Sequence, residues 1–121
     1  MLERRRFHRV RFTAEIELTH NGMAYKGQLE NISLNGALLS FKDSMIVPQD
    51  EECSLKVWLE GESVPLSMVV KVIYSNFTMI GIQFASVETE TRERLYKLME
   101  RLSNEPEKLT QERHLLKWEE E

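Results

Sequence analysis

Residues 10–22 read VRFTAEIELTHNG, and this stretch decides the class of fold. Apolar and polar side chains alternate from Val10 to Leu18, which predicts a strand with one face in the core and the other in water. The Asn21-Gly22 pair that follows is a strong signal for a two-residue hairpin turn. The stretch therefore predicts a β-hairpin whose second strand covers residues 23–32.

The rest of the chain up to residue 85 continues in the same manner. Turn-forming residues separate four more predicted strands, at residues 37–41, 53–59, 64–74 and 79–85. Short strands at regular spacing, without helical segments between them, predict an antiparallel barrel or sandwich and argue against alternating strands and helices.

The apolar period changes after Ser86. A set of four apolar residues lies on one face of a helix that is predicted to begin near Thr89: Leu95, Leu98, Met99 and Leu102. Residues 104–106 end this helix, and Pro106 suits the first position of a second one, whose apolar stripe is weak. We therefore expect one domain over residues 1–103 and a helical C-terminal extension over residues 104–121.

The composition indicates in which cellular compartment the protein is expected. The chain has 121 residues and a single cysteine, Cys53, so it forms no internal disulfide, which fits a reducing compartment. No apolar stretch approaches the roughly 18 residues of a membrane span, and no secretory signal is visible. We expect a cytoplasmic monomer that does not insert into membranes.

The positive charge is concentrated at the N-terminus. Residues 1–11 hold five arginines and one glutamate, a net charge of +4, whereas the other 110 residues have a net charge of −8. Guanidinium groups bind phosphate in a bidentate manner and stack on bases. This N-terminal arm, residues 3–10, is either a solvated tail or a site for a phosphate-bearing ligand.

Catalytic and metal-binding signatures are missing from the sequence. The histidines, His8, His20 and His114, lie in separate regions, and there is no CxxC, HxxxH or GxSxG motif and no glycine-rich phosphate loop. We expect neither an enzyme nor a metal site.

Two short motifs remain. The first is RxxxR, formed by Arg5 and Arg9. The second is NxSxxG at residues 31–36, which suits a turn at the end of a strand, because short polar side chains bond to the backbone there and glycine permits a positive φ or a close approach. Either motif alone is weak, but the two together, separated by a hairpin, are much more specific.

RxxxR followed by [D/N]xSxxG in an all-β domain with a C-terminal helix resembles the PilZ family, over roughly residues 3–102. Residues 81–84 (GIQF) are also similar to the last-strand pattern of that family. The resemblance implies a mostly β fold, a six-stranded antiparallel barrel with one or two C-terminal helices, and a bacterial receptor for cyclic di-GMP.

The resemblance also implies ligand-binding residues. Arg5 and Arg9 would bind phosphate and guanine, with Arg4 and Arg6 assisting. The second motif would line the barrel and meet a guanine edge through Asn31, Ser33 and Gly36. Tyr74, an aromatic residue at a strand end, is a candidate for stacking on a base, although an ordinary half-buried role explains it equally well.

The expected mechanism is ordering of the arm by the ligand, which an unidentified effector protein then reads. In PilZ domains an arginine at the position of Arg4 tends to accompany two stacked ligands, so we expect two cyclic di-GMP molecules per chain and no other cofactor.

Two alternatives stay open. A nucleic-acid-binding barrel of OB type is disfavoured by the negative body and by the lack of an aromatic series, and intact motifs disfavour a PilZ adaptor that has lost ligand binding.

Overall fold

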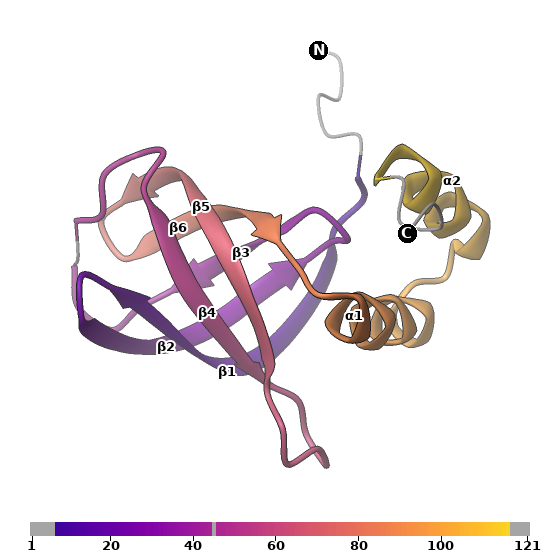
Figure 1. Cartoon of the computed structure of the whole chain (residues 1–121), viewed down its shortest axis with the longest axis horizontal. Helices are drawn as coiled ribbons and strands as arrows, with labels where there is room; N and C mark the ends of the chain where they lie inside the picture. Colours follow the sequence, from indigo (N-terminus) through magenta and orange to yellow (C-terminus); the bar gives the residue numbers. More distant parts are fainter. Residues whose placement is uncertain (1–6, 45, 117–121) are drawn as a thin grey trace.

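The computed structural model describes residues 7–44 and 46–116, which form a closed six-stranded antiparallel barrel followed by two helices (Figure 1). This confirms the predicted fold class. In chain order the elements are β1 (Val10–His20), β2 (Met23–Ile32), β3 (Gly36–Ser40), β4 (Glu52–Trp58), β5 (Leu66–Asn76), β6 (Met79–Ser86), α1 (Thr89–Leu102) and α2 (Pro106–Leu116).

The strands follow the order β1-β2-β3-β6-β5-β4 around the barrel, and every neighbouring pair is antiparallel. β1 pairs with β2 on one side and with β4 on the other, where Ile16 lies opposite Val57. Since β3 pairs with β6, the connection from β3 to β4 crosses an end of the barrel. Closure leaves none of these six strands as an open edge.

The predicted strand positions agree with the structure to within two residues. The largest difference is in β5, which begins after Pro65 and runs on to Asn76. Proline has no N–H to donate to a ladder, so the strand starts at Leu66. At its other end the ladder continues until Asn76 pairs with Met79, and the turn shrinks to Phe77 and Thr78.

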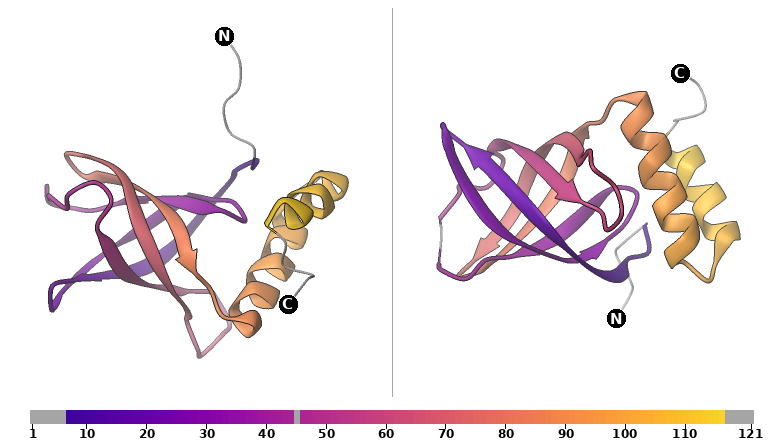
Figure 2. Two further views of the ribbon diagram at one scale, coloured as in Figure 1. Left: turned by 45° about the horizontal axis from the view of Figure 1, so that its top comes forward. Right: turned by 90° about the horizontal axis from the view of Figure 1, so that it is seen from below.

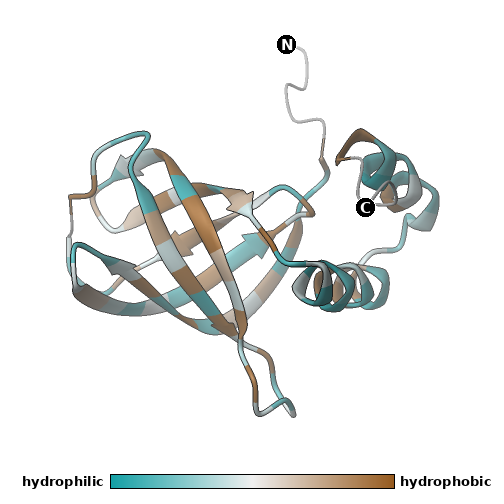
Figure 3. Cartoon of the chain, viewed as in Figure 1, coloured by the Kyte–Doolittle hydropathy of each residue, from teal (hydrophilic) through white to brown (hydrophobic). Residues whose placement is uncertain are grey.

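The core lies inside the barrel and beneath α1. Apolar residues alternate with polar ones along the strands, as the bands in Figure 3 show. Several inward side chains have no exposed surface, among them Leu18, Leu29, Leu39 and Val72, and α1 adds Leu95 and Met99. Burying a side chain of this size stabilises the fold by about 1.5–3 kcal/mol, so the closed barrel provides most of the stability.

A β-bulge interrupts the hairpin of β1 and β2. The register is continuous from the His20–Met23 pair to the Ala14–Leu29 pair and then shifts, so that Arg11 lies opposite Asn31 and Val10 opposite Ile32. Two residues of β1 therefore face one residue of β2 at this point. The shift brings the start of β1 against the motif at residues 31–36.

Both helices lie beside the end of the barrel where the arm enters β1 (Figure 2). Within the described residues, neither helix is long and apolar enough to cross a membrane. Residues 7–10 pass close to α2 because His8 is hydrogen bonded to Glu112. Residues 7–10, the motif turn and the helices thus share one end of the molecule.

Gly36 allows β3 to approach β6 closely. A Cβ at this position would overlap the carbonyl oxygen of Ile82 and lie 3.2 Å from Cα of Gln83. We expect Gly36→Ala to lower the free energy of unfolding, measured by urea denaturation, by about 1–3 kcal/mol.

Gly61 provides the control for this prediction. It has a φ of +82° in an open turn, and apart from its two chain neighbours no heavy atom of the described residues lies within 4 Å of the position that a Cβ would take. Asparagine tolerates that left-handed conformation, so Gly61→Asn should cost less than about 1 kcal/mol. A Gly36→Ala variant as stable as the wild type would contradict the close approach of the two strands.

Candidate functional site

The described part of the arm begins beside the second motif. Arg4, Arg5 and Arg6 lie outside the described residues. Phe7 is buried in the core with 7% of its surface exposed, and Arg9 is exposed one residue before β1. Because Val10 pairs with Ile32, the structure brings Arg9 next to the turn that starts at Ser33.

Ser33 shapes this turn from inside. Its hydroxyl donates to the carbonyl oxygen of Gly36 over 3.3 Å and accepts hydrogen bonds from the N–H groups of Asn35 and Gly36, each at 3.1 Å. The side chain is buried, with 3% of its surface exposed. In this structure the hydroxyl therefore serves its own turn, and the close approach that Gly36 permits is to β6, with no positive φ at this glycine.

The strand register builds one row of residues on the outer face of the barrel. This row, called the Asn31 row, crosses β1, β2, β3, β6 and β5 through Arg11, Asn31, Leu38, Gly81 and Tyr74. Tyr74 is 44% exposed, and its ring covers Gly81, where a Cβ would lie 2.5 Å from Cε1 of the ring. The row therefore carries a cation at one end, an amide next to it and an aromatic ring at the other end.

The amide of Asn31 is unsatisfied. Its Oδ1 atom is buried and has no hydrogen-bond partner among the described residues. Buried acceptors in proteins are almost always paired, so this atom is available to accept a hydrogen bond from a group outside the described residues. Guanine offers N–H donors on its edge, which match an amide oxygen.

Arg11 is a candidate that the sequence did not reveal. A regular ladder that starts from the two-residue turn pairs His20 with Met23 and would place Arg11 opposite Ile32. The bulge instead places Arg11 opposite Asn31. Its alternation with Val10 and Phe12 indicates only that it faces outward. No signal in the sequence marks the bulge, so the partner of Arg11 could not be predicted.

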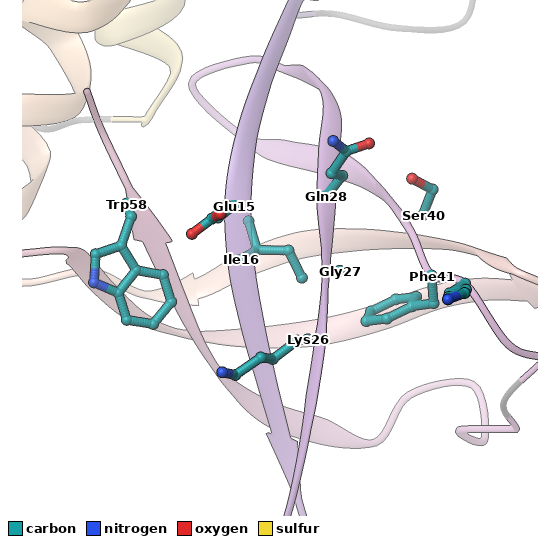
Figure 4. A pocket seen from close by; sticks show the side chains of 9 residues that line it. Glu15, Ile16, Lys26, Gly27, Gln28, Ser40, Phe41 and Trp58 are labelled. Carbon is teal, nitrogen blue, oxygen red and sulfur yellow. The ribbon is translucent and has the colours of Figure 1, made fainter.

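A pocket lies on a part of the barrel outside the Asn31 row. It has a volume of about 620 Å³, with Trp58 on one side, Phe41 on the other and Gly27 between them (Figure 4). Its remaining lining residues are Glu15, Ile16, Lys26, Gln28, Ser40 and Lys42. None of these residues belongs to either motif or to the Asn31 row, so this pocket is separate from the predicted site.

The described residues offer little reactive chemistry. No three metal-ligating side chains gather among them. Burial, together with the nearby Glu51 carboxylate, raises the pKa of the Cys53 thiol above its ordinary value. A buried thiol that stays protonated is a poor nucleophile.

Solved structures with the same fold include two complexes with c-di-GMP. The PilZ domain with c-di-GMP of YcgR from Escherichia coli is 13% identical, with a TM-score of 0.69, and the match covers 83% of this chain and 92% of that one. The K. pneumonia MrkH–c-di-GMP complex is 20% identical, with a TM-score of 0.68, and the match covers 88% and 55%.

A third similar structure is the Bacillus subtilis inhibitor of motility (MotI/DgrA), 15% identical, with a TM-score of 0.69 and coverage of 83% and 51%. The chain thus spans about half the length of the Bacillus and Klebsiella proteins. Likeness at these identities establishes the fold.

A search of curated proteins gives no match. The family model for the PilZ domain, however, matches residues 3–101. Because this match covers most of the chain, including both motifs, the chain belongs to the PilZ family, whose domains are non-catalytic receptors for cyclic di-GMP.

Proposed function

We propose that this chain binds cyclic di-GMP between its N-terminal arm and the Asn31 row, and that a separate effector protein reads the bound state. The observation that carries the proposal is the register of the β1–β2 hairpin. It puts the entry of the arm at Val10 beside Ile32 and the unsatisfied amide of Asn31. Arg9 of the first motif is thereby adjacent in the ladder to the second motif.

The chemistry of this surface suits the ligand, which has two phosphates and two guanines. Arg5 and Arg9 would form charge-assisted bonds to phosphate or to O6 and N7 of guanine. Asn31 would accept from a guanine edge, and Tyr74 is exposed for stacking on a base. Since the rest of the chain is negative, attraction of an anionic ligand is confined to the arm.

We propose that ligand binding orders only part of the arm and not all of residues 3–10. Phe7 is buried, and His8 donates its backbone N–H to Glu112 over 3.0 Å. Residues 7–8 therefore provide a fixed point in the free protein. We propose that ligand binding orders the arginines on either side of it, and that the effector recognises the surface they create.

Arg5→Ala and Arg9→Ala should each weaken cyclic di-GMP binding by about tenfold or more, because a hydrogen bond to a charged group is worth about 1.5–3 kcal/mol. Calorimetry measures the affinity, with GTP and single-stranded DNA as comparison ligands. Arg101→Ala, which removes an exposed arginine of α1, is the control and should bind like the wild type.

Unchanged affinity in Arg5→Ala or Arg9→Ala would contradict the assignment of that arginine. Binding of DNA in place of cyclic di-GMP would favour the nucleic-acid-binding alternative. Absence of binding to all three ligands would identify an adaptor without a nucleotide ligand.

Asn31→Ala and Ser33→Ala should separate binding from turn stability. Asn31→Ala removes the unsatisfied acceptor and should lower affinity while leaving the melting temperature nearly unchanged. Ser33→Ala removes three hydrogen bonds of the turn and should lower the free energy of unfolding by about 1–3 kcal/mol. Calorimetry and thermal unfolding of both variants test this. If Asn31→Ala destabilised the fold and Ser33→Ala lost affinity, Ser33 would be the binding residue and Asn31 the structural one.

Arg4 should determine the number of ligands bound. Two stacked cyclic di-GMP molecules carry four negative charges, which the net charge of +4 in residues 1–11 matches. We expect native mass spectrometry at saturating ligand to show two molecules per chain in the wild type and one in Arg4→Leu. A wild-type complex with a single ligand would show that Arg4 does not have this role.

A further inference from the structure

His8 joins the arm to both C-terminal helices. Its backbone N–H and its Nδ1 atom contact Oε2 of Glu112 at 3.0 and 2.7 Å, and its Nε2 atom lies 3.0 Å from Oγ of Ser103. Glu112 belongs to α2, whereas Ser103 is the residue that caps the C-terminus of α1. We call this set of contacts the His8 clasp.

The hydrogen bonds of the clasp hold in either charge state of the imidazole. A neutral ring donates from Nδ1 to the carboxylate and accepts from the Ser103 hydroxyl, while a protonated ring donates at both positions. The Ser103 oxygen also accepts the N–H of Glu105 at 3.0 Å, which ties the clasp to the start of α2. The contact is therefore a bonded cluster that spans the arm and the two helices.

The clasp adds a buried polar contact to the docking of α2. Leu109 is the fully buried apolar side chain of α2, and Arg113 adds a contact 4.6 Å from the centre of the Tyr96 ring. Glu112 is itself buried, with 4% of its surface exposed, and its Oε1 atom has no partner within the described residues. Without His8 the docked helix would bury an uncompensated carboxylate, which is unfavourable.

The clasp also restricts the backbone conformation at Arg9. His8 is held immediately before Arg9, and Val10 is held immediately after it by the ladder to Ile32. If the clasp opens, the nearest anchor on the N-terminal side of Arg9 moves back from His8 to the buried side chain of Phe7, and a strand end with fewer contacts frays more readily. A docked α2 thus presents Arg9 to the motif turn in a restricted set of positions.

We infer that the His8 clasp couples the cyclic di-GMP site to α2, so that docked α2 strengthens ligand binding and bound ligand strengthens the docking of α2. The second half follows from the first because coupling between two sites is reciprocal. The inference rests on the proposed function. It makes His8 and Glu112 positioning residues of the ligand site.

The test compares three variants of α2 by calorimetry with cyclic di-GMP and by amide hydrogen exchange with and without the ligand. Glu112→Ala removes the acceptor of the clasp and should weaken binding by about fivefold or more. Glu112→Gln keeps a carbonyl oxygen for His8 and should restore most of that affinity. Glu107→Ala removes an exposed carboxylate from the same helix and should bind like the wild type.

Hydrogen exchange distinguishes coupling from a purely structural role. In the wild type, the ligand should slow exchange across residues 106–116. In Glu112→Ala, exchange there should be fast and should no longer respond to the ligand. A structural role alone would loosen α2 in this variant but leave the affinity unchanged.

Three results would overturn the inference. The first is a Glu112→Ala variant that binds cyclic di-GMP as tightly as the wild type. The second is a Glu112→Ala variant that binds it more tightly, which would mean that the clasp opposes ligand binding, and the third is unchanged hydrogen exchange in wild-type α2 when the ligand is added. If wild-type protein does not bind cyclic di-GMP at all, the proposed function fails together with the coupling. Failure of the coupling alone leaves wild-type binding intact, so the two outcomes are distinguishable.

Discussion

The pairing of β1 with both β2 and β4 is the constraint on which the rest of the structure depends. This strand closes the barrel, so that side chains such as Leu18 and Leu29 lose all contact with water. The same strand begins where the arm ends, and the ladder therefore anchors the arm to the folded body. A change in β1 would act on the core, on the entry of the arm and on the Asn31 row together.

The bulge in β1 converts an ordinary hairpin into a candidate binding surface. A regular ladder would place Arg11 opposite a core-facing isoleucine, but the shifted register places it opposite Asn31. Glycine contributes at the other end of the row, since Gly81 leaves room for the ring of Tyr74. Polar and aromatic groups from strands far apart in sequence are thereby aligned on a rigid sheet, which suits recognition of a flat base.

The C-terminal extension and the arm are linked through polar contacts, whereas the barrel is held by apolar burial. α1 buries Leu95, Leu98 and Met99 against the barrel, while α2 buries mainly Leu109 and depends on Glu112 and His8. Elements with little apolar burial lie at the low end of local stability, and such elements respond most readily to a ligand. The distribution of burial therefore points to α2 as the part that can change while the barrel stays constant.

The sequence by itself determined the six strands, the two helices and both motifs, because periods of two and 3.6 residues and the Asn21-Gly22 turn are local properties. The positions of β2 and α1 were predicted to within a residue for this reason. The order of strands around the barrel, the partner of Arg11, the buried hydroxyl of Ser33 and the contact of His8 with Glu112 were decided only by the tertiary structure. His8 and Glu112 are 104 residues apart, and each is an ordinary polar residue in its own segment. Such pairings depend on how twist, the bulge and burial bring distant segments together, and no local pattern encodes that result.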